Sequence, residues 1–515
     1  MNLCVGIMGP PEGWQPILQQ EGIAHARVAG SFSPDDYSVV VVGDVLGDQE
    51  LEMLRQYLYE GGAVLSSVKT YTKLARTSCK TSFVSFFLDD ENSIFDSVGL
   101  IDIFDTCSFP RSANVLPEKS NSNAVYAGKL NDGFIIAVPF DPSIVSRDMR
   151  SRRKTFYAAE RRLPFETVST VSKGTVRLLV SRALEWLHHT RNLPYVHLWY
   201  YPHGARSIFC FRIDTDNGSR EKIEALYLLG RRHQIPMSWF VDVKHQQSFL
   251  DVFAGMDGQE IGVHCYEHRV FNDLQSNREN LRHAKGILER AGFSPKGFVS
   301  PYGQWNEHLA RAIAETGFDY SSEFGYDYDD LPCRAGGGVL QVPVHPICIG
   351  SLKRHSYSDE HMIRYFDFQI RRKLAAREPM MFYHHPNDGH HPVLEWLFEK
   401  MKNERIPAKT MSEYARWWKG RVAAVPVCSY SSKSIQFPHA VANHDVQIRI
   451  TTADRTEALV PLAPQILMDT VRWESKPPVF HFPGDFKRQR RFNFRIPLIR
   501  IIDTLSSSVK GRKYL

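Results

Sequence analysis

The stretch SIFCFRIDTDNG, residues 207–218, places two aspartates directly after an apolar run. Further along the chain the apolar run EIGV, residues 260–263, is followed by two histidines in HCYEH, residues 264–268. Each group also precedes a segment with a helical pattern, so both lie where buried strands of an α/β fold end. Active-site residues collect at that edge of a parallel sheet. We therefore predict one site that is built from both segments.

The residue types suit a metal site that carries its own base. A catalytic divalent metal takes imidazole and carboxylate ligands and keeps one position open for water or substrate. His264 and His268 with one aspartate meet that requirement, and the second aspartate can act as general base. Each half alone has a plainer interpretation, because such histidines can lie on a solvated helix face and Asp-Thr-Asp-Asn-Gly is a good turn sequence. Their shared position after strands favours the metal site.

Two further segments continue the pattern. Val299-Ser-Pro-Tyr302 follows a short apolar run, and MMFYHHPNDG, residues 380–389, has the pattern of a strand that ends in two histidines. With the first two motifs they resemble the NodB-like polysaccharide deacetylases, metal-dependent carbohydrate esterases that remove N- or O-acetyl groups from sugars. The resemblance covers residues 205–420, where the four motifs stand in order.

The resemblance implies a role for each motif residue. The implied catalytic residues are Asp214 as the base, His385 as the acid and the backbone N–H of Tyr302 as the donor to the developing oxyanion. His384 is the rival of His385. The implied ligands of a divalent metal are Asp216, His264 and His268. Zinc is the first candidate for this ligand set, which also accepts cobalt, nickel or iron.

Two positions depart from the family pattern. Cys265 stands where a hydroxyl residue braces the metal loop, and a thiol is a weak hydrogen-bond donor. Val299 stands in place of the arginine that pairs with the catalytic aspartate, which removes a fixed positive charge from beside the base. Arg212 and Arg269 lie beside the two metal motifs and could supply that charge.

The segment from 205 to 420 alternates apolar runs with helical patterns, which favours a parallel (β/α) barrel, and the resemblance implies that the barrel is distorted. We expect helices at 220–233, 276–291, 306–316, 358–376, 392–403 and 411–419, and strands at 237–241, 297–299 and 380–383. Candidate substrate contacts are Arg269, His345 and Asp327. Packing at a strand end is the alternative for His345. Asp327 lies on a Tyr- and Asp-rich loop that suits sugar hydroxyls or is an ordinary acidic loop.

Residues 1–192 are predicted to form a separate α/β domain. Short runs at 3–8, 37–42, 63–66 and 134–138 alternate with helical patterns such as 49–59, and a closing helix is expected at 172–189. The segments YSVVVVGD and EGGAVLSS resemble the flavodoxin-like core of class I glutamine amidotransferases. Cys79 and Cys107 lack the glycines of a catalytic elbow, so we interpret the domain as a non-catalytic relative used for packing, dimerisation or ligand binding. We expect an exposed loop at 147–154 and a linker at 191–205.

Residues 421–515 have the pattern of a small β-rich appendage, because runs such as VQIRITT alternate in polarity and prolines separate them. The appendage ends in a basic tail. This tail is either a solvated basic face or a surface for acidic glycan or anionic lipid. Its basic residues are Lys487, Arg488, Arg490, Arg491, Arg495 and Arg500.

The composition is that of a soluble globular protein with several domains: 515 residues, 43% hydrophobic and 23% charged. The net charge of +6 gives no indication of nucleic-acid binding. Eight cysteines without a CxxC pair argue against a zinc knuckle or a disulfide scaffold and fit a reducing compartment. The start MNLCVGIMGPPEGW lacks the pattern of a secretory signal, and no apolar run reaches the length of a membrane span. We therefore predict a cytoplasmic protein without a transmembrane segment.

The sequence favours a metal-dependent hydrolase that removes acetyl groups, N-acetyl before O-acetyl, from a saccharide or glycoconjugate precursor. The expected partner is a carbohydrate, and a homo-oligomer formed through residues 1–192 fits the pattern. The main alternative is a catalytically weakened glycan-binding or scaffolding protein of polysaccharide biosynthesis, motivated by Val299 and by the non-catalytic pattern of residues 1–192. A third hypothesis is a hydrolase of the same barrel type that acts on a non-sugar amide.

Overall fold

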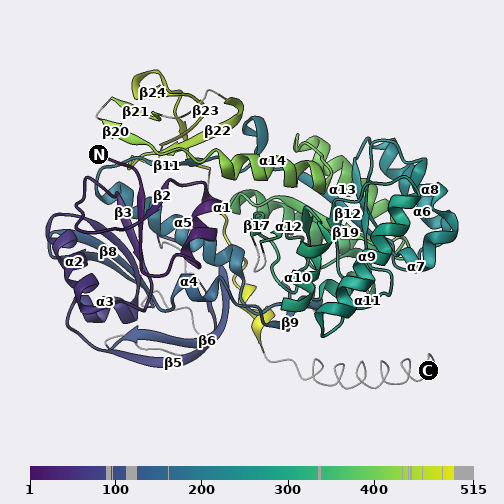
Figure 1. Cartoon of the computed structure of the whole chain (residues 1–515), viewed down its shortest axis with the longest axis horizontal. Helices are drawn as coiled ribbons and strands as arrows, with labels where there is room; N and C mark the ends of the chain where they lie inside the picture. Colours follow the sequence, from purple (N-terminus) through teal and green to yellow (C-terminus); the bar gives the residue numbers. More distant parts are fainter. Residues whose placement is uncertain are drawn as a thin grey trace.

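The computed structural model describes residues 1–88, 94–95, 97–111, 124–160, 162–334, 338–431, 433–438, 440, 443–454, 456–477 and 479–491. Figure 1 shows an N-terminal α/β unit in purple and blue, a helix-rich barrel in teal and green, and a small β-rich part in yellow-green. Within the described ranges none of the helices has the length and apolar character of a membrane span. All eight cysteines are free thiols.

The barrel is built on an eight-stranded sheet with the order β17-β18-β16-β15-β14-β13-β12-β19. Neighbours from β18 to β19 are parallel, and β17 pairs antiparallel with β18. In the described part of the chain no pairing joins β18 to β19, so the expected distorted barrel is confirmed as an open one. The strands are β12 (Phe209–Asp214), β13 (Met237–Val241), β14 (Glu260–Val263), β15 (Gly297–Phe298), β16 (Tyr320–Ser321), β17 (Cys333–Arg334), β18 (Leu340–Gln341) and β19 (Met380–His384).

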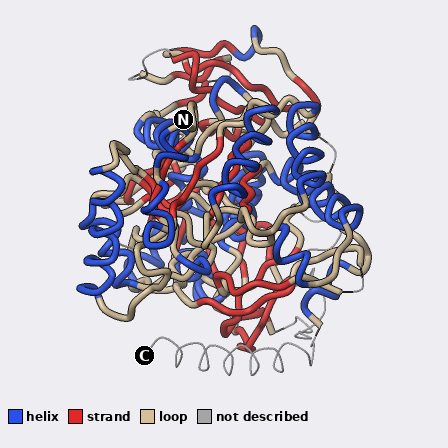
Figure 2. Tube along the Cα trace, turned by 90° about the vertical axis from the view of Figure 1, so that its right-hand side faces the viewer, coloured by secondary structure: helices blue, strands red, loops and turns tan. Residues whose placement is uncertain are grey.

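Helices cover the outside of this sheet, as the view onto the barrel in Figure 2 shows. The sequence predicts six of them within a few residues, and α14 extends beyond its predicted end. Phe209, Phe211 and Ile213 of β12 are buried, as expected for a parallel sheet under helices. The helices are α6 (Arg220–Arg232), α7 (Val243–Gln246), α8 (Asp251–Ala254), α9 (Leu274–Arg290), α10 (Glu307–Thr316), α11 (Ile349–Arg354), α12 (Asp359–Ala376), α13 (His391–Asn403) and α14 (Met411–Ala423).

The N-terminal unit contains a six-stranded sheet with the order β2-β1-β3-β4-β8-β7, in which all neighbours except β7 and β8 are parallel. Four of its strands, β1, β3, β4 and β8, lie where the apolar runs predict them, whereas β2 and β7 are not predicted. The elements are β1 (Val5–Met8), α1 (Trp14–Glu21), β2 (His25–Arg27), β3 (Val39–Val42), α2 (Asp48–Tyr59), β4 (Ala63–Ser67), α3 (Val68–Leu74), β5 (Cys79–Leu88), β6 (Leu100–Pro110), β7 (Tyr126–Leu130), β8 (Gly133–Val138), α4 (Pro142–Val145) and α5 (Lys173–Thr190).

The expected exposed loop at 147–154 is wrong in its second half. Ser151–Thr155 form β9, which pairs antiparallel with β10 (Phe165–Ser169), and Figure 1 places β9 beside the barrel. Lys154 is buried, and two contacts compensate for the loss of water around its ammonium group. That group lies 3.1 Å from the carboxylate of Asp102 and donates to the Tyr328 hydroxyl at 3.2 Å. A basic run looks exposed in the sequence when its acidic partners are distant in the chain.

The C-terminal strands also include part of the predicted linker. β11 (Tyr195–Leu198) pairs with β22 (Asn443–Thr451), and the sheet has the order β11-β22-β23-β25. Arg490 of the basic tail is not a solvated residue, because it forms an ion pair with Asp102 at 2.6 Å. Arg495 and Arg500 lie outside the described residues. The other strands are β20 (Ser429–Ser431), β21 (Ser434–Gln436), β23 (Thr456–Leu462), β24 (Gln465–Leu467) and β25 (Glu474–Ser475).

Candidate active site

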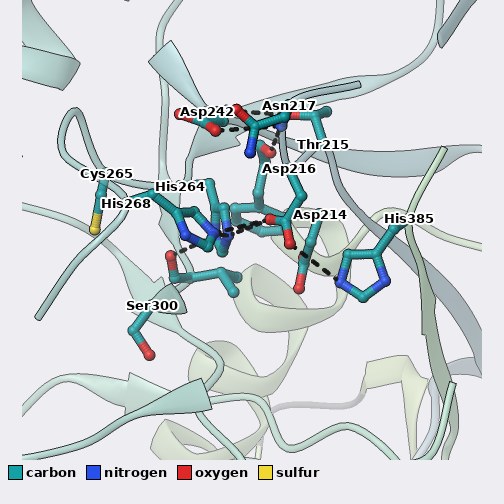
Figure 3. A network of polar contacts seen from close by, with 12 residues as sticks. Asp214, Thr215, Asp216, Asn217, Asp242, His264, Cys265, His268, Ser300 and His385 are labelled. Atoms are coloured by element: carbon teal, nitrogen blue, oxygen red, sulfur yellow. Dashed lines mark hydrogen bonds and ion pairs between the residues drawn. The ribbon is translucent and has the colours of Figure 1, made fainter. Parts of the chain in front are cut away.

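Three predicted ligand residues converge at the carboxyl ends of the barrel strands. One oxygen of Asp216 lies 2.9 Å from Nε2 of His264 and 3.1 Å from Nε2 of His268, and the two imidazole nitrogens are 3.2 Å apart. Figure 3 shows Asp216 between these imidazoles and His385. Ligand atoms around a divalent ion that is bound at about 2.1 Å lie roughly 3 Å from one another. The spacing of the three side chains therefore fits a metal.

The surroundings prepare these side chains for ligation. His264 donates from Nδ1 to the carbonyl oxygen of Val299 at 2.9 Å, which leaves Nε2 for the metal. Burial raises the pKa of Asp216, but the close contacts with His264 and His268 and the positive charge that these rings can carry outweigh burial and hold that pKa well below its usual range. Asp216 is therefore ionised, as a carboxylate ligand must be. Its side chain is 30% exposed, which leaves room for water or substrate.

Backbone conformations of positive φ cluster around the same point. Asp216 and Asn217 follow β12 with φ of 20° and 46°, Cys265 follows His264 with φ of 67°, and Tyr302 has φ of 57°. Such conformations are costly for residues other than glycine and concentrate at functional sites. Asp242 holds the first of these turns, because its buried carboxylate accepts from the backbone N–H of Asn217 at 3.3 Å.

The predicted base, Asp214, has an arginine partner despite Val299. The guanidinium of Arg212 donates to both carboxylate oxygens of Asp214, at 2.8 and 2.6 Å. Residues two apart on a strand share a face, so β12 itself brings the two side chains together. The carbonyl and hydroxyl oxygens of Ser322 accept from the same guanidinium and fix it. Of the two arginines that could replace the missing one, the structure places Arg212 at the base.

The predicted acid, His385, stands on the other side of Asp216. Its Nδ1 donates to Asp388 at 2.9 Å, and its Nε2 lies 3.7 Å from Asp216. Burial lowers the pKa of His385, but the hydrogen bond to Asp388 and the contact with Cys348 outweigh burial and raise that pKa well above its usual value. The ring is therefore protonated at neutral pH and can give up a proton. The rival His384 is buried against Phe211, and burial lowers its pKa to about 3.

A cavity of about 240 Å³ joins these groups. Asp214, Asp216, His264, Tyr302 and His385 line it. Tyr302 is 69% exposed and packs edge-on against His268, with ring centroids 5.3 Å apart. The site therefore brings a metal-binding triad, a carboxylate clamped by an arginine, and a protonated imidazole to one water-accessible space. The seven further residues of its wall are Glu166, Gly303, Phe324, Arg354, Tyr383, Asn387 and Asp388.

The three predicted substrate contacts do not reach this cavity. His345 is buried between Asp329, at 2.9 Å, and the hydroxyl of Tyr365, also at 2.9 Å, so both ring nitrogens are satisfied elsewhere. Arg269 is exposed and lies over the ring of Phe271.

Asp327 is the third predicted contact that lies elsewhere. It is 1% exposed, and the next aspartates of its loop are also occupied: Asp330 forms an ion pair with Arg177 of α5 at 2.6 Å. The loop is therefore occupied by contacts within the protein, since Asp330 pairs with α5 and Asp329 pairs with His345 and Lys373 of the barrel.

Several site residues escape prediction from the sequence. Asp388 follows His385 by three residues, and the turn PNDG is the only sign of it. Asn387 donates to the backbone oxygen of Asp216 at 3.0 Å and ties the end of β19 to the metal loop. Glu166 and Arg354 come from segments without any motif.

Comparison with known proteins supports the assignment for part of the barrel. Residues 211–321 match the family model described as polysaccharide deacetylase, so this segment carries a polysaccharide deacetylase domain. The match includes Asp214, Asp216, His264, His268 and Tyr302. Comparison with curated proteins gives no match.

Solved structures of polysaccharide deacetylases and family 4 carbohydrate esterases resemble this chain at low identity. A candidate polysaccharide deacetylase from Mycobacterium smegmatis is 18% identical with a TM-score of 0.38, and the alignment covers 42% of this chain and 92% of that one. A family 4 carbohydrate esterase from Streptomyces lividans, solved with acetate, is 12% identical with a TM-score of 0.29 and coverages of 40% and 92%. A family 4 pseudoenzyme from Bacillus anthracis is 13% identical with a TM-score of 0.31 and coverages of 42% and 68%.

Proposed function

We propose that the protein is a metal-dependent deacetylase that hydrolyses the acetyl group of an N-acetylated saccharide or glycoconjugate precursor. The observation that carries this proposal is the convergence of Asp216, His264 and His268 with the Arg212–Asp214 pair and His385 around one cavity. A divalent metal held by the triad would polarise the acetyl carbonyl and lower the pKa of water.

The protein groups divide the proton transfers between them. Asp214 takes a proton from the attacking water, and Arg212 keeps its carboxylate in place for that step. Water adds to the acetyl carbon, the backbone N–H of Tyr302 donates to the oxygen that becomes negative, and the carbon–nitrogen bond then breaks. His385 gives its proton to the departing amine while Asp388 stabilises the imidazolium. The products are acetate and an amino sugar.

The protonation state of the acid favours an amide over an ester. An amine is a poor leaving group unless it is protonated, whereas an alkoxide leaves an ester more readily. Asp388 and Cys348 hold the pKa of His385 high, so a protonated acid is present at neutral pH. We therefore favour N-acetyl over O-acetyl substrates. The alternative of a glycan-binding protein without turnover rested on Val299 and on the non-catalytic pattern of residues 1–192, and the pairing of Arg212 with Asp214 weakens the first of these grounds.

Other features complete the proposal. Zinc is the first choice of metal, because two imidazoles and one carboxylate suit it. A cytoplasmic location is supported by eight free cysteines. We regard residues 1–192 as a non-catalytic flavodoxin-like relative of the class I glutamine amidotransferases, a view supported by the parallel strand order β2-β1-β3-β4-β8. Association of two copies through this part remains a prediction.

Acetate release tests the proposal. Metal-depleted protein is reloaded with zinc, cobalt, nickel or iron and incubated with N-acetylglucosamine oligomers and with O-acetylated xylan. Asp214→Asn should lower acetate release by about 100-fold or more, since general base catalysis contributes at least that much, while metal content stays the same. Asp251→Asn is the matched control, because Asp251 is an exposed aspartate on α8. Equal acetate release by both variants would rule out Asp214 as the base.

A further inference from the structure

One wall of the cavity comes from outside the barrel. Glu166 lines the cavity together with Asp214 and His385, but it belongs to β10, which precedes α5 of the N-terminal unit. The family match begins at residue 211, after this strand. The hairpin of β9 and β10, residues 151–169, therefore completes a site whose catalytic groups all come from the barrel.

The hairpin is fixed to the barrel through its own core. Val168 and Phe156 are buried among the core residues of the barrel. Side chains two apart on a strand lie on one face, so Glu166 points to the same side as Val168, toward the barrel. Because Val168 is fully buried, β10 cannot turn away without exposing it. The position of Glu166 is thus set by packing.

Contacts at both ends of β10 hold the hairpin against the rim of the site. The backbone N–H of Ser169 donates to the carbonyl oxygen of Phe324 at 2.9 Å, and Phe324 itself lines the cavity. The ring of Phe165 packs edge-on against His355 at the end of α11, with ring centroids 4.7 Å apart. Glu166 is therefore held between two anchored neighbours.

The carboxylate of Glu166 has capacity for a ligand. One oxygen accepts from the backbone N–H of Thr167 at 2.8 Å. Arg354 and His385 line the same cavity as Glu166, and the proposed chemistry uses Asp214, Asp216 and Asp388 but not Glu166. Burial raises the pKa of Glu166, and the backbone hydrogen bond from Thr167, followed by the charge of Arg354 across the same cavity, opposes that rise. A second oxygen thus remains for hydrogen bonds from a bound molecule.

We propose that Glu166 is a substrate-binding residue, and that the hairpin 151–169 selects a neutral sugar by accepting hydrogen bonds from its hydroxyl groups. This inference rests on the proposed deacetylase function. A carboxylate accepts hydrogen bonds from hydroxyls and repels the carboxylate of an acidic sugar. The cavity of about 240 Å³ lies below the usual range for small-molecule sites, roughly 300–1,000 Å³, which suits one sugar ring rather than an oligosaccharide.

Kinetics with two kinds of acetate donor test this role. Zinc-loaded wild type, Glu166→Gln and Glu166→Ala are compared on N-acetylglucosamine and on p-nitrophenyl acetate, which has no sugar hydroxyl. Loss of a hydrogen bond to a charged group should lower kcat/KM for the sugar, relative to the ester, by roughly tenfold or more, mainly through KM. Glu160→Gln is the control, since Glu160 lies on the same hairpin, pairs with Arg364 and does not line the cavity. It should leave the ratio unchanged.

The outcomes separate this inference from the function on which it rests. Equal losses on both donors, or no change in the ratio for Glu166→Ala, would overturn the role of Glu166 while acetate release by wild type still supports the deacetylase. If wild type releases no acetate, the proposed function fails, and binding of N-acetylglucosamine by calorimetry decides the inference alone. Equal affinities of wild type and Glu166→Ala, or no binding by either, would overturn it.

Discussion

Replacing Arg212 by methionine should damage catalysis without removing the metal. The guanidinium is 1% exposed and donates twice to Asp214, which is 3% exposed. Methionine fills a similar volume but has no charge and no donor. Asp214 would then keep its place in the cavity without the group that orients it.

The magnitude follows from the geometry of the pair. Removing one partner of a buried ion pair costs about 3–5 kcal/mol of folding stability, because the other charge stays buried and unpaired. A hydrogen bond to a charged group contributes about 1.5–3 kcal/mol. If that amount is lost from the transition state, kcat falls by roughly tenfold to 150-fold. Arg212→Lys should lose less, because lysine keeps the charge but cannot make the two-pronged contact.

The assay combines zinc content, urea unfolding and the steady-state kinetics of acetate release. Arg364→Met is the matched control, since Arg364 lies on the surface of α12 and pairs with Glu160 and Glu360. It should retain wild-type kcat and zinc content. If Arg212→Met is folded, binds zinc and keeps kcat within about threefold of wild type, then Asp214 does not need an arginine partner, and the reasoning on Val299 and Arg212 is refuted.

Three further outcomes test other parts of the structure. Asp388→Asn should move the alkaline limb of the pH profile of kcat to lower pH. Asp388 holds the pKa of His385 above its usual value, and His385 can act as an acid only below that pKa. An alkaline limb at the wild-type pH would contradict the role of Asp388. Gly174→Ala should lower the free energy of unfolding by about 1–3 kcal/mol, because a Cβ there would overlap the carbonyl oxygen of Asp329. If the variant has the wild-type stability in urea, the close packing of α5 against the loop of Asp329 is contradicted. A chain that starts at residue 205 should lack a cooperative thermal transition near that of wild type, because it loses Val168 from the barrel core.

The sequence predicts the chemical centre because each motif follows a buried strand. Asp216 comes after β12 and His264 comes after β14, and parallel strands bring their carboxyl ends to one edge. The apolar period of the helices also gives their ends within a few residues, as α10 shows. These predictions needed only the local spacing of the residues and the direction of the strands, and both can be inferred from the sequence.

The substrate contacts could not be predicted, because their partners are distant in the chain. The sequence of the acidic loop around Asp327 would look the same whether its aspartates bound a sugar or paired with the buried Arg177 of α5. Lys154 looks solvated until Asp102 and Arg490 are found beside it. Glu166 carries no motif and reaches the cavity only because the barrel buries Val168 two residues later. Long-range pairing decides all of these positions.

Arg212 supplies the positive charge that the family motif would place at position 299, where this chain has Val299. The same physical role can therefore come from a different position in the sequence. The electrostatic field at the Asp214 carboxylate depends on the distance to a positive charge, and it does not matter which strand carries that charge. On β12 the i, i+2 relation puts an arginine at 2.6 Å from the carboxylate of Asp214. Residue 299 is then free to be apolar, and only its backbone oxygen is required, to orient His264. A site can therefore keep its electrostatics while its motif looks incomplete.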